Sequence, residues 1–336
     1  MTIDIMTMSY ASDLKQKYMN VWNYIQEKHC CHVDVILLYV LASTGSSPGR
    51  QGFKMAVGAD CTFTGSIGGG IMEHKFVEMA KAILAETAVH KKEVYKQVHS
   101  KDDAINQSGM ICSGEQTIFL HKVTGRDMIA VEKILRDEKD NLDGTLLLSP
   151  EGIDYAPEAA ADNFSYEKSE DSFLLKEKTG FKNTLHIIGG GHCALALSQL
   201  MRQMDFYIHL YDDRKDLDTI KRNSFVHEIH LLNSFSDVES FIGERGNVFV
   251  VIMTFGYRTD DLAVRSLFNK KLTYIGILGS KKKMEQMFKA YREEGVAEEI
   301  IKRLHAPIGV QIKSQTPAEI AISIAAEIIK VKNKAY

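Results

Sequence analysis

The sequence has few cysteines, and their arrangement excludes a protein framed by disulfide bonds. Five occur in 336 residues, an odd number with scattered spacing and no Cys-x-x-Cys pair. They are Cys30, Cys31, Cys61, Cys112 and Cys193. Because free thiols persist in reducing surroundings, this usage favours a cytoplasmic protein.

Long apolar runs and an excess of charge of one sign are also missing. The longest apolar stretches, such as VILLYVLA at 35–42, are far shorter than the roughly 20 residues that cross a bilayer. The first residues lack the basic segment and apolar run of a signal peptide. Lys plus Arg number 41 and Asp plus Glu number 44, so the net charge is −3. This balance argues against nucleic-acid and membrane partners.

The length and the patterning predict two domains and a connection. At roughly 150 residues a domain, 336 residues suggest two. Helical spacing predicts a helix over 12–29, and alternation and turn residues predict a hairpin over 54–67. Between 150 and 177, eight acidic residues stand against two lysines, with few aliphatic residues. We therefore predict a first domain over 1–150, an acidic linker over 151–180 and a second domain over 181–336. A hairpin at the edge of the first domain is the alternative for the acidic segment.

The second domain has the pattern of an α/β fold. From Leu185 onward, strand-like segments alternate with helix-like ones, which predicts a parallel sheet. The last helix has clear start signals in Thr316 as N-cap, Pro317 at N1 and Glu319 at N3. The predicted fold class is thus α/β, with an N-terminal α+β or α/β domain before a C-terminal Rossmann-like parallel sheet domain.

A glycine turn follows the first strand of that second domain. In LHIIGGGHCALALSQL, Gly189, Gly191 and Ala194 satisfy the form G-x-G-x-x-G/A. The first glycine permits the tight turn, and the second lets the backbone approach a pyrophosphate at the N-terminus of a helix. His192 directly follows these glycines. The turn predicts nucleotide binding, although a turn kept only for packing is the alternative.

Two further segments support a ligand at this edge of the sheet. Asp212 ends the next strand, about 20 residues later, where a carboxylate can accept from a ribose 2′-hydroxyl and Arg214 can meet a 2′-phosphate. GILGSKKK at 276–283 places Gly279 and Ser280 after another strand, before three lysines that would attract an anion. The plain alternative is a solvated lysine run that opens a helix.

The first domain contains two loops rich in glycine and serine, at 43–48 and 65–70. The second loop runs into a helix, a geometry that suits an anion held by backbone N–H groups. Neither has the Gly-Lys-Ser/Thr of a P-loop, so NTPase chemistry is not expected. Glu73 lies in the first helical turn, where a helix N-terminal charge is the alternative role. The candidate binding residues here are Ser46, Ser66, Gly68, Gly69, Gly70 and Glu73.

Cys112 lies between glycines in GMICSGEQTIF, just before a predicted strand. An accessible thiol there is a candidate nucleophile or soft-metal ligand. A small buried apolar side chain is the alternative. We find no acid–base pair with convincing spacing and predict no catalytic residue.

Taken together, these segments resemble the XdhC/CoxI family, accessory proteins of xanthine dehydrogenase and related molybdenum hydroxylases. The resemblance covers nearly the whole chain and rests on SSPGRQG, GSIGGGIME, the Cys112 segment, IIGGGHCALAL with YDDR, YIGILGSKKK and the TPAEIA helix. It implies a chaperone that binds the molybdenum cofactor as cargo while a cysteine desulfurase installs its terminal sulfur. It also implies delivery to a xanthine dehydrogenase-type hydroxylase.

The same resemblance implies roles for particular residues. Cys112, in Cys-Ser-Gly where the family has Cys-Gly-Gly, would handle the cofactor and approach its metal. The Rossmann domain would hold NAD(P), another nucleotide or the nucleotide-like part of the cofactor. The family often has Thr-His after the fourth Rossmann strand, whereas this chain has Thr254-Phe255 and lacks that polar group.

Two other functions stay open at this point. One is an NAD(P)-dependent oxidoreductase that uses the Rossmann turn, with His192 as an acid. The other is a nucleotide-sensing interaction module with no molybdenum role. An exposed edge of the first domain is compatible with a homodimer.

Overall fold

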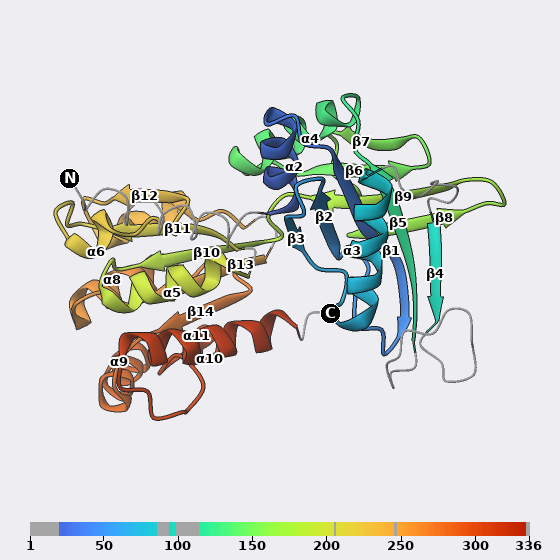
Figure 1. Cartoon of the computed structure of the whole chain (residues 1–336). Helices are drawn as coiled ribbons and strands as arrows, with labels where there is room; N and C mark the ends of the chain where they lie inside the picture. The colour runs from blue at the N-terminus through green and yellow to red at the C-terminus, as the bar shows by residue number, and fades with distance from the viewer. Residues whose placement is uncertain (1–19, 86–93, 99–113, 205, 245–246, 334–336) are drawn as a thin grey trace, which may run out of the picture. The chain divides into compact units, whose positions relative to one another are not determined.

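The computed structural model describes residues 20–85, 94–98, 114–204, 206–244 and 247–333 (Figure 1). The chain divides into two compact units, unit 1 over 1–180 and unit 2 over 181–336. Over the described ranges, no helix combines the length and the apolar character needed to span a bilayer.

Unit 1 begins with α2 (Val21–Cys30), which starts later than the predicted helix over 12–29. Asn20 has an extended backbone, and its side chain accepts a hydrogen bond from the Asn23 N–H, so it caps the helix. Residues 12–19 lie outside the described part of the chain.

A five-stranded antiparallel sheet follows, in the order β3-β2-β1-β5-β4. Its strands are β1 (Val35–Gly45), β2 (Lys54–Gly58), β3 (Phe63–Gly65), β4 (Val94–Val98) and β5 (Gly114–Lys122). The predicted hairpin over 54–67 is the β2–β3 pair. The central strand β1 is apolar on both faces because both are covered. Ile36 and Leu38 pack with α3 (Gly70–Leu84), whereas Leu37 and Tyr39 face the core that contains α2.

The prediction of an acidic linker over 151–180 is wrong. These residues supply three strands of a second antiparallel sheet, in the order β7-β6-β9-β8. Its strands are β6 (Gly144–Ser149), β7 (Gly152–Ala156), β8 (Phe164–Lys168) and β9 (Phe173–Thr179). Phe173 and Leu175 alternate inward and are buried, while Glu177 on the same strand pairs with Lys54 at 2.8 Å. The acidic composition concealed this alternation, and the hairpin alternative is closer to what β8 and β9 form.

Helix α4 (Asp127–Lys139), which the sequence analysis did not predict, connects the two sheets through its first residue. The Asp127 carboxylate is 1% exposed, accepts a hydrogen bond from the Ile153 N–H on β7 at 2.8 Å, and contacts the His121 ring on β5 at 2.9 Å. Burial alone raises the pKa of Asp127, but these hydrogen bonds and those from Thr124 outweigh it and lower the pKa to about 2.

Unit 2 is a six-stranded parallel sheet in the order β12-β11-β10-β13-β14-β15, which reverses between β10 and β13. Its strands are β10 (Asn183–Ile188), β11 (Phe206–Asp212), β12 (Glu228–Leu231), β13 (Asn247–Ile252), β14 (Tyr274–Ile277) and β15 (Leu304–His305). This confirms the predicted Rossmann-like domain, because the order is that of a doubly wound dinucleotide-binding sheet.

Helices cover both faces of this sheet (Figure 1). They are α5 (His192–Arg202), α6 (Asp218–Lys221), η1 (Phe235–Asp237), α7 (Val238–Phe241), α8 (Tyr257–Ser266), α9 (Lys281–Glu293), α10 (Glu298–Lys302) and α11 (Pro317–Lys332). One face packs on α5 and α11, and the other on α8 and α9. The predicted start of the last helix is confirmed, since Thr316 and Glu319 form a reciprocal capping box.

We predict that Asp127→Asn destabilises unit 1 at neutral pH. A carboxyl whose pKa falls from 3.8 to about 2 on folding contributes stability that is present above pH 4 and is lost as pH falls toward 2. The shift corresponds to about 2 kcal/mol. Urea unfolding monitored by fluorescence of Trp22, the single tryptophan, measures this loss.

The exposed Asp140 at the end of the same helix gives the control, Asp140→Asn, which should unfold like the wild type. The loss caused by Asp127→Asn should shrink when the measurement is repeated near pH 3. An equal loss at pH 7 and pH 3 would contradict the assignment of the stability to the ionised carboxylate.

Candidate functional site

In unit 1 the two glycine–serine loops are in direct contact. A Cβ atom on Gly68 would lie 2.5 Å from the Gly49 nitrogen, so only glycine permits this approach. The buried Gln116 on β5 donates from Nε2 to the carbonyl oxygens of Gly49 at 3.0 Å and Ile67 at 3.1 Å. Gln116 therefore ties the loops together. Gln116 was not predicted from the sequence, where the signal was an amide two residues before the apolar run Ile118, Phe119 and Leu120.

The anion-binding geometry of the second loop is present, but the protein itself fills it. Oε2 of Glu73 accepts from the Ser66 hydroxyl at 2.6 Å and from the N–H groups of Ile67 at 2.9 Å and Gly69 at 3.0 Å. Gly69, the N-cap of α3, and Gly70 both have positive φ, which aims the loop backbone at this carboxylate. An external anion at this position must displace Glu73 or compete with its charge.

The other predicted residues of unit 1 divide between exposed and undescribed positions. Ser46 is exposed, while the neighbouring Ser47 is buried and donates to the Gly49 carbonyl at 3.0 Å. Cys112 lies outside the described residues. Gly114, at the start of β5, pairs in register with Gly45, so β5 begins beside the first loop.

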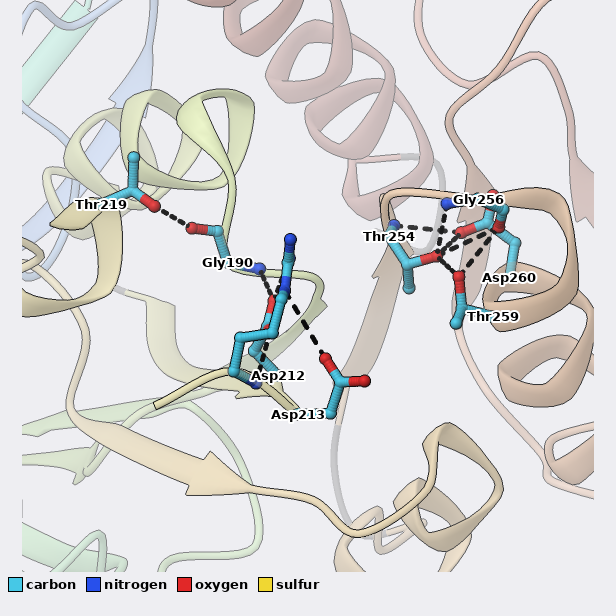
Figure 2. Close-up of polar contacts among 9 residues, drawn as sticks. Gly190, Asp212, Asp213, Thr219, Thr254, Gly256, Thr259 and Asp260 are labelled. Carbon is cyan, nitrogen blue, oxygen red and sulfur yellow. Dashed lines mark hydrogen bonds and ion pairs between the residues drawn. The ribbon is translucent and has the colours of Figure 1, made fainter. Parts of the chain in front are cut away.

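In unit 2 the glycine turn has the form of a phosphate-binding turn. Gly189 has φ +106°, and a Cβ there would lie 2.4 Å from the Met253 carbonyl oxygen. Gly190 donates to Asp212 at 2.7 Å, and its carbonyl accepts from Thr219 (Figure 2). Gly191 is the N-cap of α5 and has no side chain of its own to cap the helix, and among the described residues nothing lies within 4 Å of the position of a Cβ atom on it. Its backbone is therefore accessible to a ligand.

Asp212 supports the turn from within and does not extend toward solvent. It is buried, and Arg214 binds it with Nε on Oδ1 and NH2 on Oδ2, each at 2.8 Å. Burial raises the pKa of Asp212, but the hydrogen bonds from Arg214 and Gly190 outweigh this and lower it below its ordinary value. The carboxylate is thus ionised and already paired, unlike the ribose acceptor that the sequence suggested.

Arg214, two residues after the end of β11, contacts Phe255, which stands after β13 where the family often has histidine. Its guanidinium lies over the exposed Phe255 ring, 4.7 Å from the centroid, as a cation–π pair. The first residue of α5, His192, is exposed. The point where the strand order reverses thus presents a backbone turn, an imidazole and a stacked guanidinium.

The third predicted segment, GILGSKKK at 276–283, forms contacts within the protein. Ser280 caps α9 by accepting from the Lys283 N–H, and a Cβ on Gly279 would lie 2.8 Å from the Lys283 side chain. Lys283 forms an ion pair with the buried Asp260, which also accepts from the Thr254 N–H at 3.0 Å and hydroxyl at 2.6 Å (Figure 2). Lys283 therefore stabilises the turn after β13, while Lys281 and Lys282 remain exposed.

The fold and the turn define an α/β protein with a Rossmann-like carboxyl-terminal unit. Residues 185–328 match the XdhC Rossmann domain, and residues 32–94 match the XdhC and CoxI family. The chain belongs to the XdhC/CoxI family.

Two curated relatives match this chain over different lengths. The chain is 28% identical over 315 residues to YqeB of Escherichia coli (strain K12), described as uncharacterized, and the match covers 93% of this chain and 45% of that protein. It is 30% identical over 84 residues to a probable xanthine dehydrogenase subunit of Bacillus subtilis (strain 168), and the match covers 25% of this chain and 23% of that protein. The chain thus spans less than half the length of these relatives.

A solved structure has the same fold. A Bacillus halodurans protein described as a xanthine dehydrogenase superposes with a TM-score of 0.71 at 21% identity, over 95% of this chain and 97% of that one. At this identity the likeness establishes the fold alone.

We predict that two glycines of the Rossmann turn tolerate alanine very differently. Gly189→Ala places a methyl group against the Met253 carbonyl at a positive φ and should cost at least about 2 kcal/mol. Gly191→Ala meets open space at φ −73° and should stay within about 0.5 kcal/mol of the wild type. Urea unfolding followed by circular dichroism compares them, and equal stability of the two variants would refute the packing role of Gly189.

Proposed function

We propose that this protein binds the molybdenum cofactor as cargo and delivers it to a xanthine dehydrogenase-type molybdenum hydroxylase. Delivery follows the installation of the terminal sulfur by a cysteine desulfurase. The observation that carries the proposal is the N-terminus of α5, whose N-cap Gly191 has no side chain and borders open space among the described residues, in a chain of the XdhC/CoxI family. Molybdopterin has a phosphate or dinucleotide tail, which such a helix start suits.

The Rossmann turn of unit 2 is assigned to the nucleotide or phosphate part of a ligand. The backbone around Gly191 offers donors, and His192 lies at the first helical position. Arg214 adds positive charge at the end of β11, although Asp212 neutralises part of it. This region would hold the tail of the cofactor, or NAD(P) as a second ligand, with Gly279 and Ser280 on a neighbouring strand end.

Unit 1 is assigned to the handling of the cofactor's metal end. Glu73 already occupies the N–H groups of the second loop, so a phosphate there would meet a negative charge. A dithiolene-bound molybdenum centre is instead a soft-sulfur group that a thiolate such as Cys112 can approach. Ser46 and Gly70 would contact the pterin through neutral groups. The donors of Ser66, Gly68 and Gly69 already form hydrogen bonds within the loop, so they would contact it only after Glu73 is displaced.

The proposed role is that of a cytoplasmic carrier. A carrier needs reversible binding and a partner that receives the cargo, and no acid–base pair is required. The relative named as a probable subunit of xanthine dehydrogenase supports a hydroxylase of this class as the partner. A homodimer stays a prediction.

We predict that Gly191→Val weakens ligand binding at the Rossmann turn without unfolding unit 2. The added methyl groups enter the space in front of the α5 N-terminus, where a phosphate would approach. Anaerobic titration with molybdenum cofactor, with NAD and NADP as parallel ligands, should show at least tenfold weaker binding.

Gly243→Val is the matched control, because Gly243 is also in unit 2 with open space around it. Unchanged cofactor binding in Gly191→Val would show that the turn is vestigial. Nicotinamide binding without any cofactor binding would overturn the chaperone proposal, and substrate-dependent loss of reduced nicotinamide would then favour an oxidoreductase.

We predict separately that Cys112→Ser lowers the retention of sulfurated cofactor. Serine keeps the size of the side chain but removes the thiolate that a soft metal centre prefers. The measurement is reconstitution of an apo-hydroxylase by the loaded protein, compared with Cys30→Ser at an exposed thiol of the same unit. Equal activation by both variants would exclude a role for Cys112.

A further inference from the structure

One face of the unit 2 sheet has an unusual concentration of imidazole and phenol rings. Along β11, Tyr207, His209 and Tyr211 alternate with residues of the apolar core on the opposite face. The neighbouring edge strand β12 places Glu228 beside His209 and His230 beside Tyr211 in register. Side chains from adjacent strands therefore meet at the β12 edge of the sheet, two strands from β10, where the strand order reverses.

Three ligand-type atoms converge there. Nδ1 of His209 lies 3.0 Å from Nε2 of His230, and Oε2 of Glu228 lies 3.3 Å from Nε2 of His230 and 3.6 Å from Nδ1 of His209. A tetrahedral ion bound at about 2.0–2.1 Å holds its ligand atoms about 3.3–3.4 Å apart. The observed separations of 3.0, 3.3 and 3.6 Å bracket that value, so the three atoms have the spacing that one shared ion requires.

We propose that His209, Glu228 and His230 bind one divalent transition-metal ion of the zinc type, with a fourth position open to water. Two imidazole nitrogens and one carboxylate oxygen suit Zn²⁺ and its neighbours, whereas Mg²⁺ and Ca²⁺ prefer sets made only of oxygen. Within the described ranges, this is the one group of three such side chains that meets the geometry.

The surroundings support the three ligands. The Tyr207 hydroxyl donates to Oε1 of Glu228 at 2.8 Å and leaves Oε2 facing the imidazoles, an outer-shell contact of the kind that orients metal ligands. The His186 ring stacks on His209 at 4.7 Å and only 3° from parallel, which fixes its plane. The side chains of His209 and His230 are 13% and 19% exposed, and that of Glu228 is 44% exposed, so solvent reaches the site from the carboxylate side.

The site is independent of the proposed cofactor role. The ion would join β11 to the four-residue edge strand β12 by bonds other than the sheet hydrogen bonds. Because it binds the folded state, it would raise the melting temperature of unit 2.

The test uses the full chain, stripped with a chelator and titrated with Zn²⁺ and with Co²⁺ as a spectroscopic probe. We expect one equivalent of either ion, visible d–d absorption of four-coordinate Co²⁺, and no thiolate charge-transfer band. Glu228→Gln and His230→Gln should abolish this binding. His305→Gln is the matched control. Nδ1 of His305 lies 3.4 Å from Oε1 of Glu327 in the same unit, but this pair belongs to no group of three ligands among the described residues.

Tyr207→Phe removes only the hydroxyl that donates to Glu228 and keeps all three ligands and the packing of the ring. This variant therefore tests the site even if the ligand variants fail to fold. It should weaken Co²⁺ binding by about 10- to 100-fold. Absence of bound metal in the wild type, thiolate bands in its spectrum, or unchanged binding in Glu228→Gln and His230→Gln would each overturn the proposal.

Discussion

In two glycine turns, the second loop of unit 1 and the Rossmann turn of unit 2, a carboxylate accepts hydrogen bonds from backbone N–H groups and holds the turn in place. Tight glycine turns leave N–H groups without partners, and unpaired donors are costly once water is excluded. In unit 1 Glu73 accepts hydrogen bonds from two backbone N–H groups of the loop. In unit 2 Asp212 accepts one from the N–H of Gly190. Glu73 and Asp212, which the sequence suggests as ligand-binding residues, thus accept hydrogen bonds from the chain's own backbone.

The two turns nevertheless differ in what they leave for a ligand. Glu73 belongs to the first turn of α3 and accepts a hydrogen bond from the N–H of the N-cap Gly69, so its charge already compensates the positive end of the α3 dipole. Asp212 instead accepts from the N–H of Gly190, the residue before the N-cap, and the N-cap Gly191 has no side chain of its own to cap α5. The dipole of α5 is therefore available to an outside anion, and this asymmetry is the physical basis of the proposal that a ligand phosphate binds in unit 2.

Much of the fold was predictable from the sequence, because periodic apolar patterns report directly on burial. The Rossmann order follows from strand–helix alternation, and the capping box of α11 was legible from Thr316 and Glu319. The second sheet of unit 1 was not predicted, since its strands carry acidic residues, including Glu177 on the inward face of β9, and alternate for only a few residues. Phe173 and Leu175 were the only inward signal on β9.

The site was predictable as a set of segments but not as a set of contacts. The sequence pointed to both glycine–serine loops, yet Gln116, which joins them, comes from a distant strand. Likewise, the partner of Lys283 is Asp260, 23 residues earlier, and no local pattern links the two. The three residues of the β12 edge, His209, Glu228 and His230, meet only because β11 and β12 pair in one particular register.

The two-sided burial of β1 has a consequence for biosynthesis. This strand pairs with β2 close by but also with β5, roughly 80 residues later, and its inner face packs on Phe173 and Leu175. A nascent chain that ends before β9 would therefore expose much of that apolar strand. Unit 1 can complete its core only after synthesis has passed β9. Until then the apolar strand β1 is exposed to aggregation, because its long-range pairing forms slowly, and binding by other proteins would protect it.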